Sequence, residues 1–257
     1  MLSNLIRVEV VKRPSAKIKS PYVADIKLEN GDLALCHTPG LGCCGLVSAG
    51  RFIYVSKSAA SSKTDYTAQI AECSDSEGAH YVGIHPLVSQ KVAATLLHKI
   101  DATAVWKSEV KVDDHTRLDF VGSLADGKKI YVEVKNTMIS MCDKGRALRR
   151  AVFPEGFRKS KTDTISPRAV KHAETLAGLM GQADTAAAYL LFIVPRNDCG
   201  DGLELNVTDP TYCKAVLGAL AAGVQVRVFG LNFKVSGEIE FDKELVFHKP
   251  GGISKLR

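Results

Sequence analysis

The stretch WKSEVKVDDHTRLDFVGSLADGKKIYVEVKN, from Trp106 to Asn136, decides the fold of this chain. Polar and apolar residues alternate within it and short polar turns interrupt it, which predicts three strands. Strands joined by such short turns pair antiparallel. Side chains alternate between the two faces of a strand, so Glu133 and Lys135 share one face of the third strand. The predicted strands are Ala104 to Val112, Thr116 to Leu124 and Lys129 to Lys135.

A carboxylate on the second strand can face this pair. The turn Ala125 to Lys128 brings Asp119 back to the neighbourhood of Glu133. A shift of one residue in a hairpin moves a side chain to the opposite face of the sheet. The two carboxylates therefore share a face only if the turn has an odd number of residues or the hairpin carries a β-bulge. We predict one of these.

With Glu109 on the first strand, three carboxylates gather on one face of the predicted sheet. Like charges at close range raise one another's pKa unless a cation neutralises them, and hard oxygen ligands suit Mg²⁺ or Mn²⁺. A bound cation polarises a phosphate oxygen and lowers the pKa of a water, while Lys135 orients that water or stabilises charge at phosphorus.

This chemistry is phosphodiester cleavage. The candidate catalytic residues are Asp119, Glu133 and Lys135. The candidate metal ligands are Glu109, Asp119 and Glu133. The other interpretation of the same residues is a solvated sheet surface with an exposed salt bridge.

The net charge is concentrated in one span of the chain. There are 34 Lys and Arg against 28 Asp and Glu, a formal charge of +6. Residues 144 to 171 hold nine basic and two acidic residues, which is +7, so the remainder carries about −1. Such a span is typical of a solvated surface or of a strip that holds a phosphate backbone, and its place directly after the carboxylates favours nucleic acid. The candidate nucleic-acid contacts in the span are Arg146, Arg149, Arg150, Arg158, Lys159, Lys161, Arg168 and Lys171.

The rest of the pattern predicts an α/β chain, α+β overall. Residues 1 to 84 read as short strands with a hairpin turn at Asn30-Gly31, which predicts a small β-barrel. Residues 85 to 257 place helices around the three central strands, which predicts a mixed sheet flanked by helices. The further predicted elements are strands Leu5 to Val11, Tyr22 to Leu28, Leu33 to Cys36, Arg51 to Val55, Ala187 to Val194 and Val224 to Phe229, and helices Pro86 to Ile100, Pro167 to Met180 and Pro210 to Gly223.

Composition and spacing exclude several classes of protein. Seven cysteines without a Cys-x-x-Cys pair predict neither a zinc site nor a disulfide framework, and they fit a cytoplasmic protein. The apolar stretches are too short to span a membrane, and no secretory signal is visible, while an organelle transit peptide is left open. Gly40 to Gly45 has the spacing of a dinucleotide-binding fingerprint but lacks the strand-to-helix setting that this motif needs.

The segments KSEVK (Lys107 to Lys111), RLDF (Arg117 to Phe120) and YVEVKN (Tyr131 to Asn136) occur together with Phe153-Pro154. A helix that follows carries Arg168, Lys171, His172 and Leu176. In these features the chain resembles the sugar fermentation stimulation protein A family. The resemblance implies an N-terminal OB-like β-barrel over residues 1 to 84. Over residues 85 to 257 it implies a domain like the PD-(D/E)XK nucleases, with a restriction-endonuclease-like mixed sheet.

The resemblance also implies DNA binding and a link to the regulation of sugar metabolism, particularly of maltose. It places Asp119, Glu133 and Lys135 in a nuclease-type core, with Glu109 as a supporting carboxylate. His172, together with Lys171, falls where related folds place a phosphate or water contact.

The chain departs from the family at two points. It has His37-Thr38-Pro39-Gly40 where an Asn-Thr-Gly turn is expected, which puts the function of that barrel turn in question. The segment after Phe153-Pro154 is longer and more basic, which suggests a modified nucleic-acid contact.

Three functions remain open from the sequence. The first is a DNA-binding protein with a nuclease site that uses Mg²⁺ or Mn²⁺. The second is a non-catalytic DNA-binding regulator whose carboxylates are idle. The third is a scaffold subunit that reuses the fold for protein contacts. DNA is the expected partner, no membrane contact is expected, and an oligomer is left open.

Overall fold

The structure is a computed structural model that describes residues 2–40, 42–75, 78–141, 149–156, 160 and 163–250. The chain divides into two compact units. The first comprises Met1–Ser89, Val194–Cys199 and Gly230–Lys243, and the second comprises Gln90–Ile193, Gly200–Phe229 and Glu244–Arg257. The first unit thus extends beyond residue 84 and takes in two segments from the C-terminal half of the chain.

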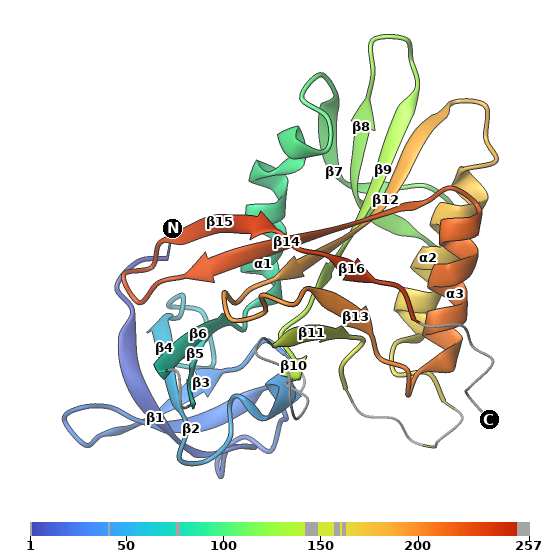
Figure 1. The fold of residues 1–257 in the computed structure, drawn as a ribbon. Helices are drawn as coiled ribbons and strands as arrows, with labels where there is room; N and C mark the ends of the chain where they lie inside the picture. Colours follow the sequence, from blue (N-terminus) through green and yellow to red (C-terminus); the bar gives the residue numbers. More distant parts are fainter. Residues whose placement is uncertain are drawn as a thin grey trace. The chain divides into compact units, whose positions relative to one another are not determined.

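A sheet that closes on itself forms most of the first unit (Figure 1). Its strand order is β3-β2-β1-β4-β5-β6, and strands that are adjacent in this order pair antiparallel. An additional parallel pairing of β3 with β5 closes a ring. The strands are β1 (Ile6–Lys12), β2 (Val23–Lys27), β3 (Leu33–His37), β4 (Phe52–Lys57), β5 (Tyr66–Asp75) and β6 (Gly78–Gly83).

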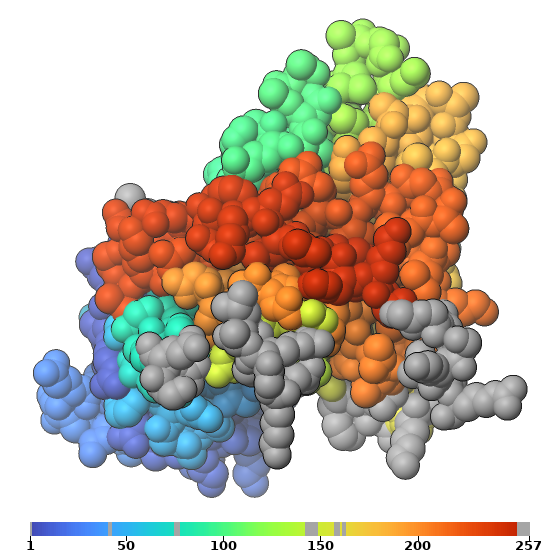
Figure 2. Space-filling model, viewed as in Figure 1, coloured from blue at the N-terminus to red at the C-terminus, as the bar shows by residue number. Residues whose placement is uncertain are grey.

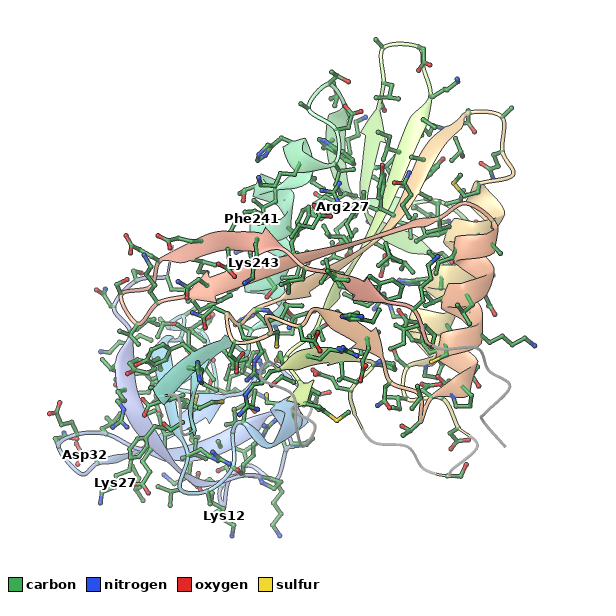
Figure 3. The ribbon with its side chains drawn as sticks, in the orientation of Figure 1. Lys12, Lys27, Asp32, Arg227, Phe241 and Lys243 are labelled. Carbon is green, nitrogen blue, oxygen red and sulfur yellow. The ribbon has the colours of Figure 1, made fainter. Side chains whose placement is uncertain are left out.

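Alternation along these strands sends apolar side chains into the ring. Val10, Ile26, Ile53 and Ile70 are fully buried there. The predicted hairpin between β2 and β3 is confirmed, since Gly31 adopts a φ of 91° in its turn, a conformation that favours glycine. Lys27 and Asp32 flank this projecting hairpin (Figure 3). A short 3-10 helix, Gly42–Gly45, occupies the glycine-rich segment that matched the dinucleotide fingerprint.

A mixed sheet with the strand order β15-β14-β12-β9-β8-β7 supplies the central strands of the second unit (Figure 1), whereas its edge strand β15 falls almost wholly in the first unit. The three strands predicted from the central stretch are present and pair antiparallel, whereas β12 pairs parallel with β9. A parallel pair needs a crossover, and a helix supplies it. The strands are β7 (Val105–Lys111), β8 (Arg117–Ser123), β9 (Lys129–Asn136), β12 (Thr185–Val194), β14 (Gln225–Phe233) and β15 (Ile239–Glu244).

A four-stranded sheet with the order β10-β11-β13-β16 adds to this unit. The sequence did not predict it, because its strands are too short to show a period of their own. The four short strands are β10 (Ser140–Met141), β11 (Arg150–Phe153), β13 (Leu203–Leu205) and β16 (Phe247–His248).

In the mixed sheet, Arg227 on β14 donates to both carboxylate oxygens of Glu244 (Figure 3).

Three α-helices are present in the described residues, α1 (Pro86–Thr95), α2 (Pro167–Leu179) and α3 (Pro210–Ala221). The hydroxyl of Ser166 accepts from the N–H of Ala169, and Asp209 accepts from Tyr212 in the same way, so side chains cap both α2 and α3 at the ends that carry proline. The two helices lie side by side, and Figure 2 shows the outer surface of α3 in orange. The predicted helix from residue 86 is α1, which ends at Thr95 and is followed by a 3-10 turn, Leu97–Lys99.

The predicted fold class, strands in the N-terminal part followed by a mixed sheet with helices, is confirmed. The cysteines in the described residues form no disulfide. In the same residues, no helix is both long enough and apolar enough to cross a membrane.

Candidate active site

Asp119 and Glu133 lie on the same face of the sheet. β8 and β9 pair in one register up to Phe120 opposite Val132, and the next pair in that register is Asp119 opposite Glu133. Residues 124–128, an odd number, separate the paired ends of the two strands. The predicted odd turn is therefore confirmed, and no bulge is needed between these strands.

The carboxylate of Asp119 is part of the sheet's hydrogen bonding. Its Oδ2 accepts from the backbone N–H of Val134 at 2.7 Å, beyond the last backbone pair of β8 with β9. Burial, followed by the negative charge of Glu133, raises the pKa of Asp119 to about 6, although the Val134 hydrogen bond acts in the opposite direction. The carboxyl group of Asp119 is therefore close to its titration range at neutral pH.

Glu133 is a buried carboxylate that accepts hydrogen bonds from two side chains. Its side chain is 4% exposed, and Oε1 accepts from Nζ of Lys135 at 2.6 Å and from Nδ1 of His172. Burial by itself raises the pKa of Glu133, but the His172 hydrogen bond and the Lys135 charge outweigh it, so the pKa lies below its usual value. The other oxygen, Oε2, is buried without a hydrogen-bond partner.

His172 reaches Glu133 from the buried face of α2, which also carries Ala169 and Leu176. Its Nε2 accepts from Nε of Arg168 at 3.4 Å. A neutral imidazole with an acceptor at Nε2 carries its hydrogen on Nδ1, and Nδ1 is the atom that faces Glu133. His172, predicted as a phosphate or water contact, therefore lies inside the site and is 4% exposed.

Glu109 is joined to the site through a residue that the sequence analysis did not single out. Nε2 of Gln90, on α1, donates to Oε1 of Glu109 at 2.9 Å and to Oδ1 of Asp119 at 2.7 Å. Glu109 itself is exposed and has a φ of 54°, a left-handed conformation in the middle of β7. The carbonyl oxygen of Glu109 accepts from Nη1 of Arg117 at 2.6 Å. Nothing in the helical period of α1 distinguishes Gln90 from a solvated polar residue.

The basic residues of the predicted strip differ in their surroundings. Arg168 and Lys171 are exposed on α2, one turn or less from His172. Arg150 is instead 13% exposed and pairs with Asp201 at 2.5 Å and Glu204 at 2.6 Å. Arg149, just before β11, is half-buried. Four of the predicted contacts lie outside the described residues: Arg146, Arg158, Lys159 and Lys161.

The donor set of the site fits a hard cation that keeps much of its water. In the part of the chain that the structure describes, no three His, Cys, Asp or Glu side chains form a preformed metal cluster. Mg²⁺ does not require one, because it is commonly held by one or two carboxylates with water completing the shell. Asp119 and Glu133 supply two facing carboxylates, and the buried, unpartnered Oε2 of Glu133 is an oxygen in need of a partner.

Comparison with known proteins places these residues in a family. The sequence model described as the sugar fermentation stimulation protein RE domain matches residues 84–237, which include every residue of the site. The chain belongs to this family. The sugar fermentation stimulation protein homolog of Synechococcus elongatus is 30% identical over 224 residues, which cover 84% of this chain and 86% of the relative.

Other family members agree with this assignment. The homolog of Caulobacter vibrioides is 30% identical over 215 residues, covering 81% of this chain and 82% of the relative. The solved structure of Pyrococcus furiosus SfsA in complex with Ca²⁺ superposes with a TM-score of 0.74 at 22% identity and covers 96% of this chain and 97% of that one. The sugar fermentation stimulation fold thus extends over nearly the whole chain.

Proposed function

We propose that this protein binds DNA and cleaves phosphodiester bonds with Mg²⁺ or Mn²⁺ at Asp119, Glu133 and Lys135. The observation that carries the proposal is the convergence of these three side chains on one face of β8 and β9, with Glu133 buried against Lys135 and His172. Buried carboxylates with shifted pKa values beside a lysine are costly to a fold and are typical of functional sites. A solvated sheet surface, the alternative from the sequence, does not bury a glutamate at 4% exposure.

The cation would be held by Asp119 and Glu133, with Glu109 at the exposed edge. When bound, Mg²⁺ or Mn²⁺ polarises a phosphate oxygen and lowers the pKa of a bound water. Pyrococcus furiosus SfsA was solved in complex with Ca²⁺, which also prefers oxygen ligands, and this supports a cation-binding role for the fold.

The chain's own side chains orient the reacting groups. Nζ of Lys135 carries three donors, of which one bonds to Glu133, so the others can hold a water or a phosphate oxygen beside the carboxylates. The Nδ1–H of His172 fixes Glu133, which leaves the buried Oε2 of that carboxylate as the ligand atom without a hydrogen-bond partner. Arg168 and Lys171 on the same helix supply exposed positive charge for the phosphates that flank the cleaved bond.

Cleavage assays with the full chain test the proposal. Single- and double-stranded DNA and RNA are incubated with Mg²⁺, Mn²⁺ or EDTA, beside the double variant Asp119→Asn, Glu133→Gln. Glu174→Gln, an exposed acid on α2 outside the site, is the matched control. We expect cation-dependent cleavage of DNA by the wild type and the control only. Cleavage that persists in the double variant would exclude the site.

A second function is favoured by one observation. Oε1 of Glu133 and both oxygens of Asp119 already have partners, so the carboxylates are satisfied in part without a cation. This arrangement suits a DNA-binding regulator, in sugar metabolism as the family name suggests, whose carboxylates are idle. Salt-sensitive DNA binding with no cleavage under any cation would favour it, and the absence of both binding and cleavage would leave the scaffold function.

A further inference from the structure

Gln90 occupies the space between two of the candidate metal ligands. One nitrogen, Nε2, donates to Glu109 at 2.9 Å and to Asp119 at 2.7 Å. Ionised carboxylates only accept hydrogen bonds, so the amide must turn its nitrogen toward them and its oxygen away. The amide hydrogens therefore lie where a cation shared by the two carboxylates would place its positive charge.

The side chain also has room to leave. A pocket of about 220 Å³ lies beside it, lined by Gln90, Lys91, Ala94, Ser108, Glu109 and Phe120. Gln90 is only partly buried, and within the described residues its amide makes just the two hydrogen bonds to the carboxylates. Rotation about its side-chain torsions would move the amide into this pocket without repacking of the core residues of α1.

We propose that Gln90 is an amide latch, a positioning residue that holds Glu109 and Asp119 together in the absence of a cation and must swing away before a cation binds them. The inference rests on the proposed cation site, and it adds a regulatory residue from a helix that supplies no ligand. The latch lowers the site's affinity for cations, because each binding event must first break two hydrogen bonds to charged oxygens.

The variant Gln90→Met tests the latch, since methionine has a similar length and no hydrogen-bonding amide. We expect Gln90→Met to bind Mn²⁺ about tenfold more tightly than the wild type in calorimetric titration, the equivalent of about 1.4 kcal/mol. In EDTA the same variant should melt at a lower temperature than the wild type, because the carboxylates have lost their bridge. Gln182→Met, at an exposed glutamine of the same unit, is the matched control and should follow the wild type in both measurements.

The opposite outcome is equally clear. If Gln90 were a cation ligand through its amide oxygen, Gln90→Met would bind Mn²⁺ more weakly, and this result would overturn the latch. Unchanged affinity and unchanged melting in EDTA would also overturn it. Neither measurement depends on cleavage, so the failure of the latch is distinct from the failure of the nuclease. If the wild type cleaves DNA but Gln90→Met has the same Mn²⁺ affinity and the same melting temperature in EDTA as the wild type, the latch alone is refuted. A variant that binds Mn²⁺ tightly but cleaves nothing refutes the nuclease alone.

Discussion

Asp119 lies directly opposite Glu133 in the register of β8 and β9, and the two carboxylates have pKa values displaced in opposite directions. The pKa of Glu133 is lowered because a histidine and a lysine donate to it, despite its burial. For Asp119, burial and the negative charge of Glu133 outweigh the Val134 hydrogen bond and the Lys135 charge, so its pKa is raised. The two carboxyl groups therefore differ in protonation: Glu133 stays ionised at neutral pH, and Asp119 takes up a proton as the pH falls through about 6.

The first prediction concerns the pH dependence of stability. The pKa of Asp119 rises from 3.8 to about 6 on folding, so the folded protein keeps a proton that the unfolded chain has lost. The contribution of Asp119 to the free energy of unfolding therefore falls as the pH rises from about 4 to about 6. We expect a fall of roughly 1–2 kcal/mol, which allows for partial exposure of the carboxylate.

The variant Asp119→Asn isolates this contribution, because asparagine can accept from Val134 but does not titrate. Urea unfolding in EDTA at pH 4 and at pH 7 measures the free energy of unfolding for both proteins. The variant should lose less stability than the wild type between these two pH values. Parallel profiles of the two proteins would contradict the raised pKa.

The second prediction concerns His172, which in the proposed mechanism acts through its hydrogen bond to Glu133. His172→Ala removes the Nδ1 donor and leaves Oε1 of Glu133 with Lys135 alone. Loss of a group that orients a metal ligand typically lowers metal affinity or activity by about 10- to 100-fold. We expect this loss in the cleavage rate and in Mn²⁺ affinity.

His172→Asn serves as the conservative comparison, because its amide nitrogen can stand near the Nδ1 position. We expect it to recover most of the activity that the alanine variant loses. If His172 only filled space in the core, both variants would lower the thermal stability, and asparagine would not recover the Mn²⁺ affinity.

The third prediction separates the exposed basic residues of the strip from the one that is paired with carboxylates. Removal of two exposed phosphate contacts by Arg168→Ala with Lys171→Ala should weaken DNA binding. The slope of log K against log salt should become shallower by about 1.8 for duplex DNA. Fluorescence anisotropy at several salt concentrations measures this slope.

Arg150→Ala is the informative counterpart. Because Arg150 is paired with Asp201 and Glu204, its removal takes the arginine away from both partly buried carboxylates. We expect a lower free energy of unfolding, by about 1–3 kcal/mol, and a salt slope equal to that of the wild type. A shallower slope for Arg150→Ala would return this residue to the nucleic-acid contacts.

The fourth prediction concerns Lys135. Lys135→Met keeps the length of the side chain but removes the ammonium group, while His172 continues to bond Glu133. We expect the variant to fold and to bind DNA as the wild type does, with cleavage reduced at least 100-fold. Lys129 lies on the same strand as Lys135, is half-buried and is paired with Asp184, so Lys129→Met is the control for charge alone.

The sequence predicted those parts of the molecule that depend on local pattern. Alternation located β9, and the Ser166-Pro167 pair located α2. The proposal that Asp119 and Glu133 share a face predicted an odd turn or a β-bulge, and the structure has the odd turn. Each of these follows from side chains within one or two neighbouring elements. The α/β class followed from the order of such elements.

The remainder depends on contacts between residues far apart in the chain. Gln90 bonds to Asp119 across 29 positions, and Arg150 meets Asp201 across 51, so neither partner was visible from local spacing. The left-handed backbone of Glu109 has no sequence signal, since glutamate rarely adopts it. Strand β5 was missed because a polar residue, Gln69, occupies a buried position, where its Nε2 donates to Ser56 on β4.

The hydrogen bond from Val134 to Asp119 has a consequence for how this site evolves. A backbone N–H in the sheet depends on that carboxylate, so a mutation of Asp119 unpairs the main chain as well as altering the chemistry. We therefore expect the sheet to favour retention of Asp119 whether or not the proposed cleavage takes place. The side chain of Lys135 makes no hydrogen bond to the main chain in the described residues, so we expect substitutions at this lysine to be tolerated first where cleavage is not needed.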